Sequence, residues 1–410
     1  MLKRERPTMQ HSDAPSSAQR VVARVRVGLV LLAASAILLA LCASAALAAS
    51  LTYTLTPATV PYGQPVTVAG TVDPAAAGQQ VAVAIDGVDV ANAVTDATGN
   101  FTVDFTPTRG GALTARLVAD GTTGPQLTLA VQPVVTVKVL NATAFLRAVL
   151  RVRIAPAAYR GVIETRVLHH AVWGRTTHTV AKAGHTLLQA PLKGVGRFVV
   201  ELTFKPSEGL AERSLRVTVK VAGHRVAAGS RGAEVRALLE ALARLRFRVP
   251  GISSNMSSAA ADAVVAFQKA YRLPRTYVFD RDDWAKLDRA RLLRPRYARP
   301  KLHIEIDKGR QILMVVKHGA VLGIVPVSTG ATGNTPEGTH TIMWKAYAAS
   351  TPYGHGLLYW DMQFHPGFAM HAYPFVPPYP ASHGCVRQPS WAAPWTYANS
   401  YAGETVYVYH

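Results

Sequence analysis

Alternating apolar and polar residues dominate the first half of this chain of 410 residues. The alternation is clear at residues 52–55, 66–70, 81–87 and 101–105. A period of two is typical of strands that bury one face, because successive side chains point to opposite sides of a sheet. Asp-Gly, Thr-Gly and Pro-containing turns separate these stretches at intervals of eight to fifteen residues. The pattern predicts a β-sandwich over residues 51–134.

The strand pattern continues over residues 135–222, for example at 135–139 and 214–221. It predicts a second sandwich of similar size. The pattern resembles bacterial Ig-like repeats, and nothing in it carries chemistry. We therefore expect both domains to act as spacers.

The hydrophobic period then changes from two to about 3.6, which predicts helices. Residues 232–242 form an amphipathic segment whose apolar positions share one face: Val235, Leu238, Leu239 and Leu242. A second helix is predicted over residues 259–271, with Ser257 or Ser258 as its N-cap. A third helix is predicted to open at Asp282.

Two short motifs give this helical segment, residues 225–290, a possible identity. Residues 231–235 read RGAEV and residues 264–268 read VVAFQ. Together they resemble the peptidoglycan-binding domain, a three-helix unit, and the alternative is a purely structural helical spacer. Residues 289–300, with five arginines and two prolines, are predicted to be an exposed linker.

Strand patterns return in the last part of the chain, at residues 302–306 and 311–316. Lys308-Gly309 is a plausible hairpin turn between them. We therefore predict a mostly-β domain over residues 300–410. The fold class predicted for the whole chain is multidomain: two β-sandwiches, a three-helix domain and a mostly-β domain.

The candidate chemistry lies in this last domain. Cys385 is the only cysteine outside the apolar N-terminal run, and it stands in the sequence SHGCVR. A thiol becomes nucleophilic when an imidazole, a cation or backbone N–H groups favour its ionisation. His371 follows a strand-like run, Arg387 is permanently cationic, and the N–H groups of Gly384 and Cys385 can point at a developing oxyanion. The segment therefore predicts a cysteine nucleophile.

Two other interpretations compete with a nucleophile. A lone cysteine is often a buried small hydrophobic residue. A zinc site is the second alternative, given the possible ligands His365, His371, His383 and Cys385. No compact ligand pair such as CxxC or HExxH is present. The histidines His169, His170 and His178 also suggest a metal, but exposed strand and loop histidines are commoner. We expect no metal site.

The combination of SHGCVR at residues 382–387 with His371 resembles the L,D-transpeptidase catalytic domain of the YkuD type. Residues 327–330 (VSTG) and 334–339 (NTPEGT) are similar to the strand and turn of that family, STG…TPxGxF. The resemblance covers residues 301–410.

The resemblance implies roles for individual residues. Cys385 would be the nucleophile, His371 the general base and Gly384 part of the oxyanion hole. His383 and Arg387 would support the thiol and the substrate, and Ser382 would lie in the substrate site.

One position departs from the family pattern. The family usually has Gly, or sometimes Ser, after the first histidine, and this chain has Ala372. A backbone carbonyl at that position can still orient the imidazole of His371. We therefore expect the site to be active.

Aromatic residues flank the motif: Tyr353, Tyr359, Trp360, Trp391 and Trp395. They can wall a cleft, and Tyr353 and Tyr359 are candidates for binding the substrate. Each one alone is more often a core residue than a ligand contact.

The N-terminal segment predicts export. Three arginines, Arg20, Arg24 and Arg26, precede an uncharged run at residues 27–49. An A-x-A cleavage site at residues 46–48 favours a signal peptide over residues 1–49, and the length of the run also allows a membrane anchor. Cys42 suggests a lipoprotein, but Leu41 stands where a small residue is needed. The body of the protein is then expected outside the cytoplasmic membrane, in the cell wall or envelope.

The charge distribution indicates an anionic partner. The formal net charge is +20, of which residues 1–50 contribute +4 and residues 51–134 contribute −4, so residues 135–410 carry +20. Nucleic acid is the usual polyanion for such a surface. Predicted export argues against nucleic acid and favours an anionic cell wall.

The resemblance implies a function as well as a fold. An L,D-transpeptidase cross-links peptidoglycan stem peptides through a thioacyl-enzyme, needs no cofactor and is acylated by carbapenem β-lactams. Two alternatives remain: an L,D-carboxypeptidase, in which water resolves the same intermediate, and a non-catalytic cell-wall-binding protein.

Overall fold

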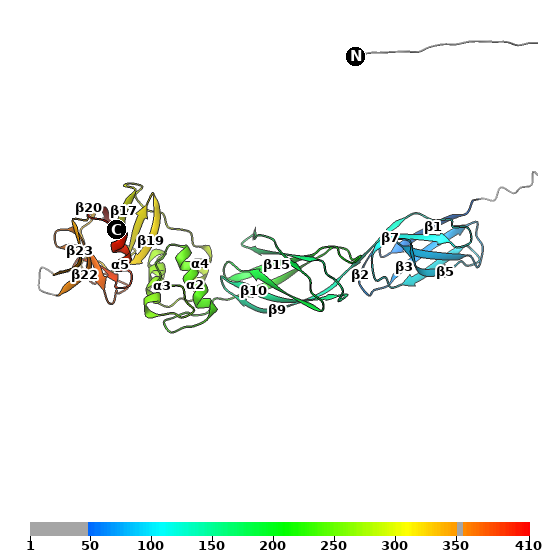
Figure 1. Cartoon of the computed structure of the whole chain (residues 1–410), viewed down its shortest axis with the longest axis horizontal. Coiled ribbons are helices and arrows are strands. Elements are labelled where there is room, and N and C mark those ends of the chain that lie inside the picture. Colours follow the sequence, from blue (N-terminus) through cyan, green and yellow to red (C-terminus); the bar gives the residue numbers. More distant parts are fainter. Residues whose placement is uncertain (1–47, 351–355) are drawn as a thin grey trace, which may run out of the picture.

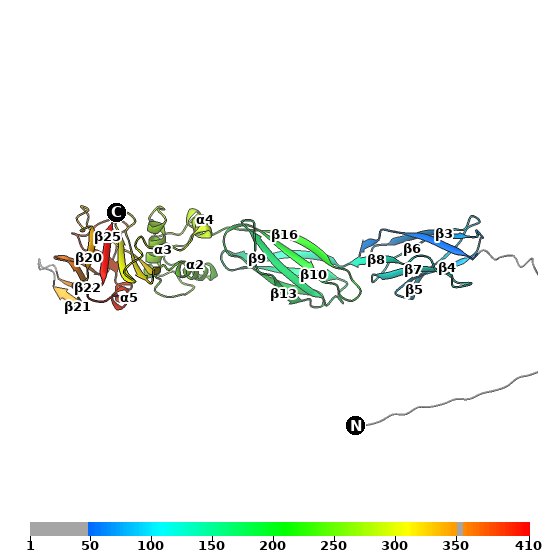
Figure 2. The ribbon, with the colours of Figure 1, turned by 90° about the horizontal axis from the view of Figure 1, so that it is seen from above.

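The computed structural model describes residues 48–350 and 356–410 as a row of units (Figure 1). A second view at 90° shows the same linear order (Figure 2). Nearly all of the predicted signal or anchor segment, with Cys42, and the candidate Tyr353 lie outside the described residues. No helix within the described part of the chain is long and apolar enough to cross a membrane. The protein is multidomain and mostly β.

The first unit contains two sheets. Its strands are β1 (Ser50–Thr56), β2 (Thr59–Pro61), β3 (Val66–Asp73), β4 (Gln80–Ile85), β5 (Val88–Val94), β6 (Asn100–Phe105), β7 (Gly111–Leu117) and β8 (Leu127–Gln132). One sheet has the order β1-β3-β6 and the other β2-β8-β7-β4-β5. The strands predicted at residues 52–55, 66–70, 81–87 and 101–105 are confirmed, except that the third ends at residue 85.

The second unit also contains two sheets. Its strands are β9 (Val134–Thr143), β10 (Arg147–Ala155), β11 (Val162–His169), β12 (Val172–Trp173), β13 (Thr177–Val180), β14 (His185–Pro191), β15 (Gly196–Phe204) and β16 (Arg213–Val221). The sheet β14-β10-β9 faces the sheet β12-β11-β15-β16, on which β13 pairs with β11.

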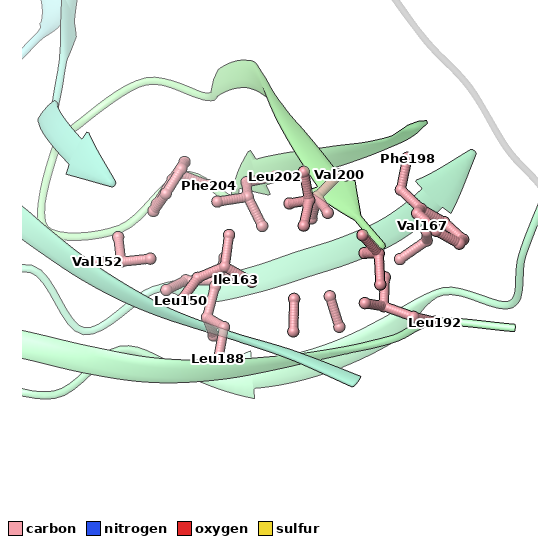
Figure 3. Packing of buried hydrophobic residues seen from close by; sticks show 14 of the residues in the cluster. Leu150, Val152, Ile163, Val167, Leu188, Leu192, Phe198, Val200, Leu202 and Phe204 are labelled. Atoms are coloured by element: carbon pink, nitrogen blue, oxygen red, sulfur yellow. The ribbon is translucent and has the colours of Figure 1, made fainter. Parts of the chain in front are cut away.

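Alternating burial explains why the two sheets of the second unit pack together. In β14 every second residue is buried. Figure 3 shows Leu150 and Leu188 from one sheet pointing toward Ile163, Val200 and Leu202 from the other. All five side chains are at most 1% exposed. Burying each one contributes about 1.5–3 kcal/mol.

Helices follow the second unit. They are α2 (Ala233–Arg244), α3 (Ser258–Ala270) and α4 (Arg281–Arg289). Ser257 is the N-cap of α3, and its side chain accepts a hydrogen bond from the Ala260 N–H. Asp280 and Asp283 form a capping box at the start of α4. The predicted helices are therefore confirmed within one or two residues.

The last unit contains two further sheets and a short helix, α5 (Ala393–Ala398). One sheet, β19-β18-β17-β25-β20, is built from β17 (Leu302–Asp307), β18 (Ile312–Lys317), β19 (Ala320–Pro326), β20 (Gly338–Thr341) and β25 (Thr405–Tyr409). The other, β21-β22-β23-β24, is built from β21 (Trp344–Ser350), β22 (Leu357–His365), β23 (Phe368–Tyr373) and β24 (Val386–Pro389).

The predicted hairpin turn at Lys308-Gly309 is confirmed, and it is longer than these two residues. Asp307 pairs with Ile312, so four residues connect β17 to β18. The left-handed backbone is at Gln311, with a φ of 62°, and not at Gly309. The Lys308 side chain is buried.

The helical unit packs against the sheet β19-β18-β17-β25-β20 of the last unit. Phe247, which follows α2, forms a bridge with Ile324 of β19, and the Arg248 N–H donates to the Ile324 carbonyl at 3.0 Å. Five residues of β18 and β19 share one hydrophobic cluster with the helices: Ile312, Met314, Val316, Val321 and Ile324. The guanidinium of Arg248 lies 4.4 Å from the ring centre of Trp395. The helices therefore support one face of the sheet.

Candidate active site

Parallel pairing of β23 with β24 brings the two motif segments together. His371 of β23 pairs with Arg387 of β24, and Met370 pairs with Val386. Cys385 immediately precedes β24, so the thiol lies at the end of the sheet beside the His371 strand. Residues 374–385 form the loop that this parallel connection requires.

The imidazole of His371 is held in one orientation. The side chain is buried, and its Nδ1 lies 2.9 Å from the Ala372 carbonyl oxygen. Since a carbonyl only accepts, Nδ1 carries the proton and Nε2 is left with a lone pair. Burial lowers the pKa of His371, and the nearby Arg387 guanidinium lowers it further. Ala372 has no positive φ, so Gly is not needed there.

The thiol of Cys385 is partly buried, and Sγ lies 3.9 Å from the Gly367 carbonyl oxygen. Burial raises the pKa of the Cys385 thiol, and the Asp361 carboxyl adds to that effect. The Ala369 N–H and Arg387 act in the opposite direction. Both pKa shifts favour the neutral form of the side chain.

Ser382 closes the loop around the cysteine. Its Oγ accepts a hydrogen bond from the Gly384 N–H at 3.0 Å and donates to the Cys385 carbonyl. The Gly384 amide, which we had expected to point at an oxyanion, is thus engaged by Ser382 in this structure. Ser382 is 4% exposed, so its hydrogen bonds hold the loop from the protein interior.

Gly384 is required for a steric reason. Its φ of +144° lies in the region that favours glycine. A Cβ atom there would come 2.5 Å from Phe368 Cε1 and 3.3 Å from Asn334 Nδ2. A side chain at this position therefore clashes with β23 and with the neighbouring turn.

The VSTG and NTPEGT segments hold the cysteine loop in place. Thr335 Oγ1 donates to the Gly384 carbonyl at 2.6 Å and accepts from the Gly330 N–H at 2.9 Å. Asn334 Nδ2 donates to the His383 carbonyl at 2.7 Å. The motifs thus position the loop, a role that the sequence did not reveal for Thr335 and Asn334.

Lys308 is a further residue that the sequence analysis missed. Its Nζ donates to the carbonyls of Gly333 and Thr335, at 2.7 and 2.9 Å, and to Glu337 Oε1 at 3.0 Å. These bonds fix the turn that carries Thr335. A lysine after a strand gives no signal of this contact, because its partners lie 25 or more residues away.

The remaining candidates divide into near and distant residues. Arg387 Nη1 donates to the Ala381 carbonyl at 3.0 Å, and its guanidinium lies 4.2 Å from the ring centre of Tyr373. The His383 side chain is exposed next to the thiol loop. Tyr359 lies on β22, and among the described residues its ring contacts that of Tyr347.

The tryptophans after the motif belong to interfaces and not to the site. Trp391 Nε1 donates to Asp262 Oδ2 of α3 at 2.8 Å. The ring of Trp395 stacks against the guanidinium of Arg248. Both residues join the last unit to the helices.

Asp361 is a buried carboxyl near the thiol that the sequence did not single out. It is 1% exposed, and its Oδ1 makes no hydrogen bond. Burial raises the pKa of Asp361 to about 7. Within the described residues, His365, His371, His383 and Cys385 do not converge as a metal-ligand group.

The last unit is similar to a known catalytic domain. Residues 301–408 match the family model of the L,D-transpeptidase catalytic domain, YkuD. A crystal structure of the L,D-transpeptidase (residues 123–326) from Xylanimonas cellulosilytica is 30% identical; the match covers 47% of this chain and 100% of that one, with a TM-score of 0.44. A search of curated proteins found no match.

Two further solved structures are similar. The L,D-transpeptidase from Stackebrandtia nassauensis is 22% identical, over 46% of this chain and 97% of that one, with a TM-score of 0.31. The catalytic domain of an E. faecium L,D-transpeptidase acylated by ertapenem is 21% identical, over 27% of this chain and 98% of that one, with a TM-score of 0.24.

Proposed function

Because the chain belongs to the L,D-transpeptidase family, with a YkuD catalytic domain at residues 301–408, we propose that it cross-links peptidoglycan through a thioacyl-enzyme on Cys385. The observation that carries this proposal is the orientation of His371. Its Nδ1 proton is bound to the Ala372 carbonyl, which leaves Nε2 as the base for the thiol beside it.

The chemistry proceeds in two steps. His371 Nε2 takes the proton of Cys385 as Sγ attacks a peptide carbonyl, and the backbone amide of Cys385 stabilises the oxyanion. His371 then gives that proton to the leaving amine as the C–N bond breaks, and a thioester remains on Cys385. An amine acceptor next attacks the thioester, loses its proton to His371 and releases the thiol.

The donor and acceptor are proposed from the family. The donor is the L,D bond of a tetrapeptide stem, with release of terminal D-Ala, and the acceptor is the side-chain amine of a neighbouring stem. The product is a three-to-three cross-link. Arg387, beside the loop, is placed to bind a substrate carboxylate, and Ser382 acts by holding the loop.

The rest of the chain fits a wall enzyme. We propose that residues 225–290 are a peptidoglycan-binding domain and that residues 51–134 and 135–222 are Ig-like spacers. Residues 1–49 would export the protein or anchor it in the membrane. The basic charge of residues 135–410 supports an anionic wall as the partner.

Hydrolysis of the same thioester would make the protein an L,D-carboxypeptidase. The test is intact-mass spectrometry of the full chain in detergent after incubation with a carbapenem, beside Cys385→Ala. We expect one adduct on the wild type and none on the variant. A tetrapeptide donor, with and without an amine acceptor, then separates transfer from hydrolysis. A folded, reduced wild type that forms no adduct would support the non-catalytic wall-binding alternative.

A further inference from the structure

Three potential metal ligands converge where the second β unit meets the helices. His169 is the last residue of β11, His170 follows it in the turn to β12, and Asp288 lies on α4. His169 Nε2 is 3.1 and 3.0 Å from the two oxygens of Asp288, and His170 Nε2 is 2.6 Å from Oδ2. Figures 1 and 2 show α4 on the side of the helical unit that faces the second unit.

Both ring nitrogens of His169 face oxygen acceptors. His169 Nδ1 lies 3.2 Å from the Arg197 carbonyl oxygen, which can only accept a hydrogen bond. Nε2 faces both oxygens of the Asp288 carboxylate. With Nδ1 protonated, either a second proton or a metal ion on Nε2 satisfies that contact. A backbone carbonyl on the distal nitrogen is also the usual outer partner of a metal-bound histidine.

The surroundings keep the ligands in place. The His169 ring stacks on Phe198 with centroids 3.9 Å apart, and its side chain is 15% exposed. The Asp288 side chain is 5% exposed. A Cβ on Gly194 would lie 1.6 Å from Asp288 Oδ1 and 2.9 Å from His169 Nε2, so the glycine makes the space that the cluster occupies.

We propose that His169, His170 and Asp288 bind a divalent transition-metal ion of the Zn²⁺ class. Imidazole nitrogens and a carboxylate are typical ligands of Zn²⁺, at about 2.0–2.2 Å from the ion. Ligands at that distance and at tetrahedral angles lie about 3.3–3.6 Å apart. The three ligand atoms all lie within 4.8 Å of one another, so side-chain rotations alone can admit the ion.

The ion would have a structural role outside the transpeptidase site. Two ligands come from the second β unit and one from α4, so the ion joins these units. The His170 side chain is 46% exposed, which leaves water access to the remaining coordination position. The ion would stabilise the joint between the spacer and the helices.

The test measures metal binding by the untagged full chain in detergent. Both cysteines are alkylated beforehand so that thiolates cannot bind the metal. Equilibrium dialysis against Zn²⁺ with elemental analysis gives stoichiometry and Kd, and Co²⁺ gives visible absorption bands from the bound ion. We expect one ion per chain. Loss of an outer-shell partner alone costs up to about 100-fold in metal affinity, so His170→Ala and Asp288→Ala should weaken binding by at least that factor.

His178→Ala is the matched control, because His178 is an exposed histidine of the same sheet whose Nε2 lies 3.4 Å from Glu164. It should change Kd by less than about twofold if its surface contact is independent of the site. His170 is also half-exposed, so its variant should fold, as circular dichroism will show. A wild type that binds no Zn²⁺, or a folded His170→Ala variant with wild-type affinity, would overturn the proposed site.

Discussion

The hydrogen bond between His371 and the Ala372 carbonyl determines which imidazole nitrogen can act as the base. The same residue has a lowered pKa, while the pKa of Cys385 is raised. These shifts disfavour an ion pair between the two side chains. In the proposed mechanism, the proton would then move from Cys385 to His371 during the attack.

This arrangement predicts that the rate of carbapenem acylation declines only at a lower pH than a histidine of ordinary pKa would give. Since His371 acts when neutral and its pKa is lowered, the rate should stay level as the pH falls through the usual histidine value of about 6.5. The rate should decline only at lower pH. The second-order acylation rate from pH 4.5 to 9 measures this. A midpoint at or above 6.5 would contradict the burial argument.

His371→Gln provides the control for that profile. Without the base, acylation needs a pre-formed thiolate, so the rate should be lower and should rise with pH toward the raised pKa of Cys385. A mutant profile that keeps the wild-type plateau would mean that another group takes the thiol proton.

Thr335→Val tests the support beneath the cysteine loop. The change removes the acceptor of the Gly330 N–H and the donor to the Gly384 carbonyl, and both groups are buried. Each unsatisfied group costs about 1–3 kcal/mol, so the free energy of unfolding should fall by about 2 kcal/mol or more. Urea unfolding measures this, and acylation should slow as well. Thr339→Val, on the exposed part of β20, should change stability by less than about 0.5 kcal/mol.

At the scale of elements, local patterns were enough to predict most helices and strands. The Ser257 cap of α3 is confirmed, because capping depends on neighbours three residues away. The Lys308-Gly309 hairpin turn is also confirmed, but the contacts of Lys308 with Gly333 and Glu337 were not predicted. Such long-range contacts leave no periodic signal in the sequence. For the same reason, the surroundings of Thr335, Asp361 and Lys269 could not be predicted from the sequence.

Lys269 connects α3 to the loops beside the site. Its Nζ donates to the Val327 carbonyl at 2.8 Å and to the Pro377 carbonyl at 3.3 Å. Val327 directly precedes the STG motif, and Pro377 lies in the loop between His371 and Cys385. Burial lowers the pKa of Lys269 to about 7. Its neutral amine has two hydrogens, which suffice for the two carbonyls.

This burial predicts a pH-dependent stability. An unfolded lysine has a pKa of about 10.4, so between pH 7 and 10 the unfolded state binds more protons than the native state. The contribution of Lys269 to the free energy of unfolding should therefore increase with pH, by up to about 1.4 kcal/mol per unit. Lys269→Met should remove this slope in denaturant titrations. Lys286→Met, at an exposed position of α4, should retain it.

At the scale of the whole molecule, the sequence suggested separate helical and catalytic domains joined by an exposed linker. The structure has that linker largely exposed and also packs the helices on β18 and β19 through a shared cluster. Period and composition predict each unit but cannot show which apolar face covers another. The identity of the family was accessible because SHGC and its histidine form a local motif.

The shared cluster predicts how far the chain can be shortened. A fragment of residues 224–410 should fold and form the carbapenem adduct. A fragment of residues 300–410 exposes Ile312, Met314, Val316, Val321 and Ile324, so it should aggregate or unfold at a lower temperature. Calorimetry and adduct mass measure both properties. Equal stability of the two fragments would mean that the helices contribute no support to the sheet.

Backbone hydrogen bonds also connect the first β unit to the second, and such contacts limit the distance of Cys385 from the start of the row. Between the first two units, the Gly110 N–H donates to the Gly209 carbonyl at 2.7 Å and the Ala211 N–H donates to the Val131 carbonyl at 2.8 Å. The catalytic unit lies at the opposite end of the row from β1 (Figure 1). The free end of a stiff rod that is held at its other end stays at one distance from that point. The free end of a flexible tether also reaches every shorter distance. If residues 1–49 anchor the chain, as proposed, Cys385 would meet wall polymers at one distance from the anchor and not those nearer to it.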